Sequence, residues 1–95
     1  MATVTCRSRR ALDFDPAKDA ANIAKHGVSL ARAADMDLRL VIRDDRHDYG
    51  EARFRGFGLI DGQPFCVAFT VRAGSVRPIS LRRAHRKEFE RYVGQ

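Results

Sequence analysis

The spacing of apolar residues changes along the chain, and its first stretch has a helical period. Alanines at positions 17, 20, 21 and 24 fall on one stripe, with Ile23 beside them. Asp15 is a frequent N-cap residue, Pro16 suits the first helical position, and Gly27 can adopt the left-handed conformation that ends a helix. The pattern predicts a helix over residues 16–26.

A second helix is expected from Leu30 to about Met36, with Ser29 as its N-cap. After it, the period changes to the alternation of apolar and polar positions that half-buried strands show. The alternation predicts four strands, over residues 38–43, 51–60, 64–71 and 76–81. Residues 11–15 are a further candidate for a short first strand.

Turn residues separate the predicted strands. Asp61-Gly62 is typical of the type I′ turn in a two-residue β-hairpin, residues 73–75 form the next turn, and residues 44–50 form a polar loop. A basic terminal helix follows, with helical spacing of Phe89, Tyr92 and Val93. The whole pattern predicts an α+β domain with an antiparallel sheet of about four strands, two N-terminal helices and one C-terminal helix. We expect the helices on one face of the sheet.

Length and charge narrow the class of protein. The chain has 95 residues, enough for one domain with a modest core, which we expect over residues 12–95. Residues 1–11 are a basic leader, for which a tail, a short strand or an upstream start codon are the alternatives. The formal net charge of +6 favours a polyanionic partner. From Arg72 onward, seven Lys or Arg stand against two Glu, so the charge is concentrated in the C-terminal third.

Cysteine spacing and hydropathy argue against a metal-binding, secreted or membrane-spanning protein. Cys6 and Cys66 have no metal-ligand spacing, and Cys66 lies in an apolar run where we expect it to be buried. A reduced, cytoplasmic setting follows. No apolar run approaches the length of a membrane span, and no secretory signal follows the start. Acidic residues show no paired arrangement for metal binding, so we expect neither a metal nor another cofactor.

The strongest chemical signal is the stretch I-S-L-R-R-A-H-R-K-E over residues 79–88. Arginine side chains bind phosphate oxygens bidentately and keep their charge near neutral pH. At the end of a strand, Arg82 and Arg83 point to opposite faces, so one shares a face with Arg77 and the other with Ser80. A solvated basic surface without chemistry is the alternative, and composition alone leaves both open.

Several stretches resemble the BrnT family of bacterial type II toxins, which are small ribonucleases with a RelE-like fold. The resemblance covers about residues 12–93. It rests on F-D-P-A-K-D-A-A-N-I-A-K-H-G-V-S (14–29), G-L-I-D-G (58–62), F-T-V-R (69–72), R-P-I-S-L-R-R-A (77–84), Glu88 and Tyr92. Two positions depart from the family pattern. The usual Trp near the first strand is replaced by Asp13 or Phe14, and His85 stands where a Ser or Thr would complete a capping box with Glu88.

The implied reaction sets the list of candidate residues. Metal-free RNA cleavage uses the 2′-hydroxyl as nucleophile, and it needs a base, cations near the phosphorane and an acid for the leaving oxygen. The candidate charge stabilisers are Arg72, Arg82 and Arg83, of which Arg72 and Arg83 are the strongest. The candidates for proton transfer are Lys25, His26, Glu51, His85 and Tyr92. RNA contacts are expected from Arg77, Ser80, Arg86 and Lys87.

Each proton-transfer candidate also has a purely structural interpretation. Lys25 and His26 fall in the last turn of the first helix, where the helix dipole favours cations. Tyr92 at helical spacing from Phe89 suits packing. Glu51 can pair with a neighbouring arginine across the sheet.

We interpret the sequence as the toxin of a type II toxin–antitoxin pair, a cytoplasmic endoribonuclease that cleaves RNA and arrests growth. The resemblance implies a BrnA-like antitoxin of the ribbon-helix-helix type, which binds operator DNA and masks the toxin. It also implies that the joint complex represses its own promoter. The second hypothesis is a catalytically silent basic module that binds nucleic acid and acts only in repression. A convergent site of arginines with an acid or base would favour the enzyme.

Overall fold

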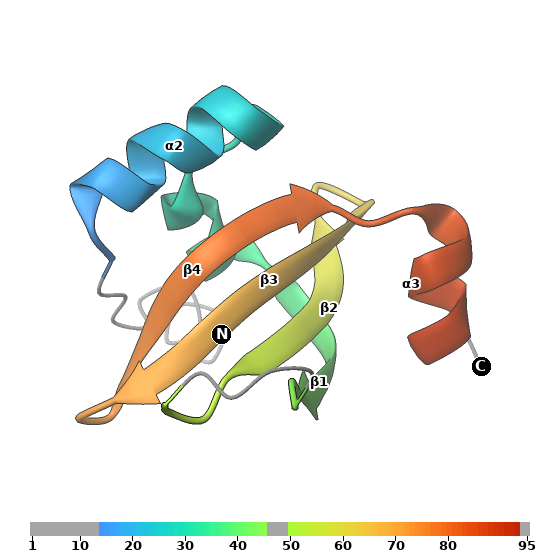
Figure 1. Cartoon of the computed structure of the whole chain (residues 1–95). Helices are drawn as coiled ribbons and strands as arrows, with labels where there is room; N and C mark the ends of the chain where they lie inside the picture. The colour runs from blue at the N-terminus through green and yellow to red at the C-terminus, as the bar shows by residue number, and fades with distance from the viewer. Residues whose placement is uncertain (1–13, 46–49, 94–95) are drawn as a thin grey trace, which may run out of the picture.

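The computed structural model describes residues 14–45 and 50–93. These residues form four strands, two α-helices and a 3₁₀ helix (Figure 1). In chain order the elements are α2 (Pro16–His26), η1 (Leu30–Asp35), β1 (Asp37–Arg43), β2 (Phe54–Ile60), β3 (Gln63–Arg72), β4 (Ser75–Arg83) and α3 (Arg86–Tyr92). The sheet is antiparallel with the order β1-β2-β3-β4. This confirms the predicted α+β fold, and the RelE-like label stays a prediction.

The two N-terminal helices begin and end where their capping residues predict. Asp15 Oδ1 accepts a hydrogen bond from Ala17 N at 2.9 Å, and Gly27 closes α2 with φ of 76°. Ser29 is the N-cap of the second helix, as predicted. This helix is a 3₁₀ helix, η1, rather than an α-helix.

Strand β1 begins one residue before its predicted range, and β3 is one residue longer at each end. Strand β4 is one residue longer at its N-terminal end and two residues longer at its C-terminal end, and two other predicted strands differ more. The predicted strand over 51–60 begins only at Phe54, because residues 51–53 leave the ladder. A short strand was predicted over residues 11–15, but its described residues Phe14 and Asp15 form no strand. Residues 11–13, the leader at 1–11 and part of the polar loop, residues 46–49, lie outside the described residues. The turn at Asp61 and Gly62 has φ angles of 52° and 77°, which confirms the type I′ prediction.

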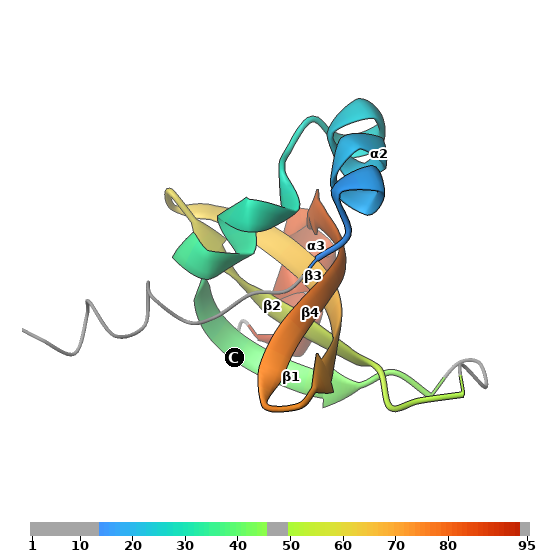
Figure 2. The same cartoon turned by 90° about the vertical axis from the view of Figure 1, so that its left-hand side faces the viewer.

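Helices cover both faces of the sheet, so the prediction of helices on one face is wrong. The first face carries Ile60, Phe65, Val67, Phe69 and Leu81, and Leu30 of η1 packs with them in one core. The second face carries Phe57 and Cys66, which pack against Phe89 of α3. Figures 1 and 2 show α2 and α3 well apart around the sheet. The reason is that Phe57 and Cys66 are apolar at positions that alternate to the second face. Cys66 is buried, as expected.

An irregularity in β4 changes which side chains share a face. Ala68 pairs with Ser80 but Phe69 pairs with Pro78, so β4 holds one extra residue, Ile79, at a β-bulge. Because of the extra residue, side chains on either side of the bulge change the face of the sheet to which odd and even positions point. As a result, Arg77, Ser80 and Arg82 all lie on the second face, while Arg83 lies on the first. The expectation that Arg77 and Ser80 occupy opposite faces is therefore wrong.

The outer edge of β4 is fixed to α2 by a single buried amide. Asn22 Nδ2 donates to Leu81 O at 2.9 Å and to Val28 O at 2.8 Å, and Asn22 Oδ1 accepts from Leu81 N at 3.1 Å. The side chain thus satisfies both backbone groups that Leu81 presents at the edge strand. These bonds place the C-terminal half of α2 beside Ser80 and Arg82.

Candidate functional site

The second face of the sheet carries a cluster of arginines and hydroxyls around a small residue. Ala68 on β3 pairs with Arg55 on β2 and with Ser80 on β4. One row toward the β3–β4 turn, Thr70 pairs with Arg77. One row the other way, Cys66 pairs with Arg82. We call this surface the arginine face, and its members are Arg55, Thr70, Arg77, Ser80 and Arg82.

Two polar groups of the arginine face are buried without a hydrogen-bond partner. Thr70 is 1% exposed and its Oγ1 has no partner, and the Nε of Arg55 is likewise buried and unpartnered. A buried polar group without a partner costs roughly 1–3 kcal/mol of stability, so proteins rarely keep one without a role. Both groups can donate a hydrogen bond, and an anion such as a phosphate oxygen would satisfy them.

Arg82 connects the arginine face to α3. Its two terminal nitrogens donate to the two carboxylate oxygens of Glu88, each at 3.0 Å. The bidentate pair is partly buried, and the guanidinium of Arg82 holds the pKa of the Glu88 carboxyl below its ordinary value. Glu88 is therefore an ionised carboxylate next to an arginine at neutral pH.

Tyr92 lies on the same side, beside Arg55. Its ring stacks on Phe57 with centroids 4.9 Å apart, and Arg55 Cζ is 5.5 Å from the Tyr92 centroid. Tyr92 is 36% exposed, so it packs against the sheet and also borders the arginine face. Both interpretations made from the sequence therefore fit its position.

A groove of about 400 Å³ separates α2 from β4. Positions 18, 21, 22, 25 and 26 of α2 form one helical stripe along it. The lining residues are Lys18, Ala21, Asn22, Lys25, His26, Ile79, Ser80 and Arg82. Ser80 and Arg82 thus belong to both the groove and the arginine face. The structure brings together four of the predicted residues here, namely Lys25, His26, Ser80 and Arg82.

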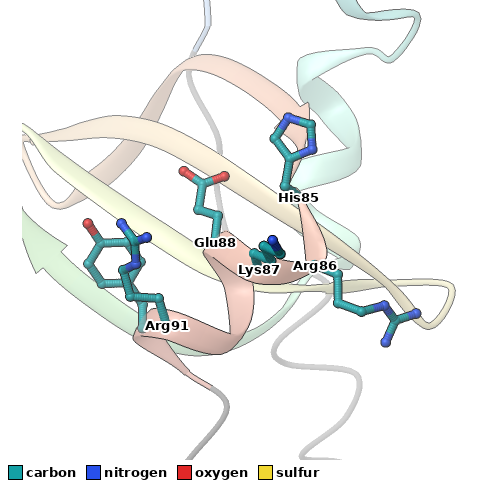
Figure 3. A pocket seen from close by; sticks show the side chains of 6 residues that line it. His85, Arg86, Lys87, Glu88 and Arg91 are labelled. Atoms are coloured by element: carbon teal, nitrogen blue, oxygen red, sulfur yellow. The ribbon is translucent and has the colours of Figure 1, made fainter.

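A hollow of about 470 Å³ on α3 contains the remaining C-terminal candidates. Its lining residues are His85, Arg86, Lys87, Glu88, Arg91 and Tyr92 (Figure 3). Glu88 and Arg86 point away from one another in Figure 3, and it is Glu88 that reaches Arg82. Arg86 and Lys87 are exposed, so they border the site without entering it.

Three predicted catalytic residues lie away from Arg82. Arg72 pairs with Ser75 at the other end of β3 and β4, and its Nη2 donates to Glu51 Oε1 at 3.0 Å. Glu51 therefore has the structural role foreseen for it as an alternative. Arg83 points to the first face, where its Nη2 donates to Gln63 Oε1 at 2.7 Å. The structure does not bring Arg83 together with the other arginines.

The sequence of this chain also matches a known protein family. A family model described as "Ribonuclease toxin, BrnT, of type II toxin-antitoxin system" matches residues 14–88. The chain belongs to the BrnT family. A comparison with curated proteins finds no match. The family description implies an RNA target and a protein antitoxin as partner.

The BrnT match includes α2 and the sheet completely and reaches the first turn of α3, up to Glu88. Lys25 and His26 at one end and Glu88 at the other therefore lie inside the matched region. The match does not extend to Tyr92.

Sequence reasoning missed four residues of this BrnT-family site: Lys18, Arg55, Thr70 and Glu88. Arg55 was visible only as the polar position of an alternating strand, and Glu88 only as part of the family pattern. The sequence does not single out Thr70, because only the structure shows that its hydroxyl is buried without a hydrogen-bond partner. The spacing of Lys18 seven residues before Lys25 was a usable signal, since it places both on one helical stripe.

Two further findings concern the described residues 14–45 and 50–93. They contain no group of three or more His, Cys, Asp or Glu side chains placed to hold a metal ion. No helix in this part of the chain has the length and apolar character needed to cross a membrane.

Proposed function

We propose that this BrnT-family chain is a metal-independent endoribonuclease whose arginine face holds the scissile phosphate. The observation that carries the proposal is the buried Thr70 hydroxyl without a partner. It lies opposite Arg77 on the face that also carries Arg55 one row away and Arg82 two rows away. Guanidinium groups match phosphate oxygens in shape and charge, and a phosphate would satisfy the unpaired donors.

The chemistry needed is transesterification within the RNA backbone. The 2′-oxygen attacks the adjacent phosphorus, the O2′–P bond forms and the P–O5′ bond breaks. The 2′-hydroxyl proton goes to a base, and the departing 5′-oxygen takes a proton from an acid. The products are a 2′,3′-cyclic phosphate and a 5′-hydroxyl. Arginines fixed around the phosphorane stabilise its extra negative charge, and stabilisation of this kind accounts for much of the rate enhancement in many enzymes.

Two proton-transfer groups approach Arg82 from different elements. Glu88 comes from α3 and is ionised at neutral pH, so it can accept the 2′-hydroxyl proton on a lone pair that Arg82 leaves free. The lowered pKa by itself makes Glu88 a weaker base, so its proposed role rests on its position beside Arg82. His26 comes from α2 and lines the groove that Arg82 borders. We assign Glu88 as the base and His26 as the acid. The attacking and leaving oxygens lie on opposite sides of the phosphorus, and the two helices likewise flank Arg82 on two sides.

The other predicted residues take binding or positioning roles in this proposal. Tyr92 packs beside Arg55 and keeps its guanidinium on the face. Arg72, paired with Glu51, positions the chain near the β3–β4 turn. Arg86 and Lys87 contact RNA at the rim. Arg83 has no role in the reaction, because it lies on the other face.

Metal independence is supported by the charge already present on the arginine face. Arg77, Arg55 and Arg82 lie on this face in three successive rows of the sheet, and in the proposed reaction their guanidinium groups supply the positive charge that metal ions give in other nucleases. The proposed reaction needs no further cation.

The partner follows from the family and from the charge. We infer a ribbon-helix-helix antitoxin of the BrnA type, which masks the basic face and carries the complex to operator DNA. The chain acts in the cytoplasm, where its RNA substrate is made. The net charge of +6 supports an acidic contact surface on that antitoxin.

A catalytically silent nucleic-acid-binding module remains the second candidate function. The discriminating feature is a proton-transfer group near the arginines. Glu88 hydrogen-bonded to Arg82 is such a group, and it favours the enzyme.

Cleavage of labelled RNA by the purified chain in EDTA tests the proposal. We expect cleavage with a 2′,3′-cyclic phosphate end, and no cleavage of the same sequence as DNA. Loss of cleavage in EDTA that Mg²⁺ restores would contradict the metal-free mechanism. Binding of RNA without any cleavage would support the silent module instead.

A further inference from the structure

The groove between α2 and β4 has a charge distribution that the reaction itself does not require. Lys18 and Lys25 contribute two cationic groups, and His26 adds a titratable one. Arg82 also lines the groove, with its charge paired to Glu88 of α3, and no carboxylate belongs to the lining itself. Ala21 is the small residue of the stripe and leaves space between the two lysines. The described groove is thus a positively charged channel with a polar wall.

The position of the groove relates it directly to the arginine face. Ser80 and Arg82 line the groove and also belong to that face. Asn22 fixes the distance between α2 and β4 through its bonds to Leu81. A chain of phosphates that lies on the arginine face can therefore continue over the β4 edge into the groove without leaving positive potential.

The two lysines suit a backbone contact rather than a proton transfer. Lys18 and Lys25 are seven residues apart, which is about 10 Å along a helix axis. Both side chains are exposed and carry point charges on flexible stems, as is typical of phosphate contacts. A charged groove that follows one backbone is the usual way to bind single-stranded nucleic acid.

We propose that this groove binds the backbone phosphates of the nucleotides next to the cleavage site, with Lys18 and Lys25 as the contact residues. The inference rests on the proposed function and deepens it. It assigns the substrate as single-stranded RNA longer than a dinucleotide, whose strand crosses the β4 edge.

Binding of non-cleavable RNA separates this proposal from catalysis. The probes are 2′-O-methyl oligonucleotides of two and eight nucleotides, and affinity is measured at several salt concentrations. The test variant is Lys18→Ala with Lys25→Ala. The control is Arg39→Ala with Arg43→Ala, which removes the same charge from exposed positions on β1, the other edge of the sheet.

We expect the groove variant to bind the octamer more weakly, and we expect its affinity to depend less on the salt concentration. The slope of log K against log salt should fall by about 1.4, because each lost contact with a single strand removes about 0.7. The control should keep the wild-type slope, and dinucleotide binding should be equal in all three proteins. Thermal unfolding checks that both variants fold, and since all four substituted side chains are exposed we expect wild-type melting behaviour.

One outcome would overturn the groove assignment alone, and another would overturn the proposed function as well. If the wild type binds the octamer but the groove variant keeps the wild-type slope, the groove is not on the RNA path and the proposed function stands. If the wild type binds no RNA, the proposed function fails along with the groove assignment.

Discussion

Arg82 connects three parts of the described site. It lies on the arginine face, lines the groove, and holds Glu88 with two hydrogen bonds. Arg83, the next residue, lies on the opposite face against Gln63. Two adjacent residues of the same type therefore have different expected roles, and this difference makes them a matched pair for experiment.

The pair between Arg82 and Glu88 predicts a pH-dependent stability. The folded-state pKa of Glu88 is lowered, first by the hydrogen bond from Arg82, so the pair stabilises the fold fully above the ordinary glutamate pKa of about 4.3. This contribution is lost as the pH falls through the folded-state pKa. Glu88→Gln should be less stable than wild type at pH 7, with a difference that closes in acid. Urea unfolding at several pH values measures it, with Glu90→Gln as control. A difference that does not change with pH would contradict the assignment.

The unpartnered hydroxyl of Thr70 predicts opposite effects on stability and activity. Thr70→Val keeps the shape and removes a buried group whose burial costs roughly 1–3 kcal/mol. The variant should be about 1 kcal/mol more stable and should cleave RNA about tenfold more slowly, the loss of one substrate hydrogen bond. Thr70→Ser keeps the hydroxyl and should keep most activity. Full activity in Thr70→Val would show that the hydroxyl does not serve the substrate.

At the scale of elements, the site depends on how α2 and α3 are held against the sheet. Asn22 attaches α2 to the edge of β4, and the pair between Glu88 and Arg82 attaches α3 to the same strand. Strand β4 is thus the element to which both helices are tied. The bulge at Ile79 then sets which of its side chains reach the site.

Removal of the Asn22 amide should release α2 from β4. Asn22→Ala leaves the backbone N–H and C=O of Leu81 buried without their partner, which costs roughly 1–3 kcal/mol for each unsatisfied group. We expect a loss of about 2–4 kcal/mol in urea unfolding, together with reduced RNA cleavage at temperatures where the variant is folded. Unchanged stability would show that the amide does not hold the helix.

Local signals were sufficient for several elements and insufficient for the site. The N-cap at Asp15, the C-cap at Gly27 and the turn at Asp61 were predicted because each depends on neighbouring residues only. The bulge at Ile79 depends on pairing with β3, and α3 covers Phe57 through contacts distant in sequence. Neither is visible in a single-strand pattern, and this is why Arg83 was preferred to Arg82.

At the scale of the whole molecule, one basic surface extends from α2 over β4 to α3. Lys18 and Lys25 lie at one end, Arg77 and Arg82 in the middle, and Arg86 at the other end. These cationic side chains come from three different elements and border one continuous part of the described surface. The antitoxin that neutralises the chain should cover this region with Asp and Glu side chains.

This arrangement predicts salt-dependent association with the antitoxin. The Debye length falls from about 10 Å at 0.1 M salt to about 3 Å at 1 M, so the association rate should fall markedly over this range. Dissociation should change less, because desolvated contacts set the residence time. Stopped-flow binding at several salt concentrations measures both rates. A salt-independent association rate, or full ribonuclease activity in the saturated complex, would show that the antitoxin binds elsewhere.

The central claim is that the arginine face cleaves RNA, and kcat/KM of Arg82→Ala and Arg83→Ala tests it most directly. Both variants lose one positive charge at neighbouring positions of β4, and both are assayed in EDTA below the temperature at which either unfolds. Arg82→Ala should lose about 10²-fold or more, the usual effect of removing one donor to a transition-state oxyanion, while Arg83→Ala should keep nearly wild-type activity. Equal losses in the two variants, or an active Arg82→Ala, would contradict the account.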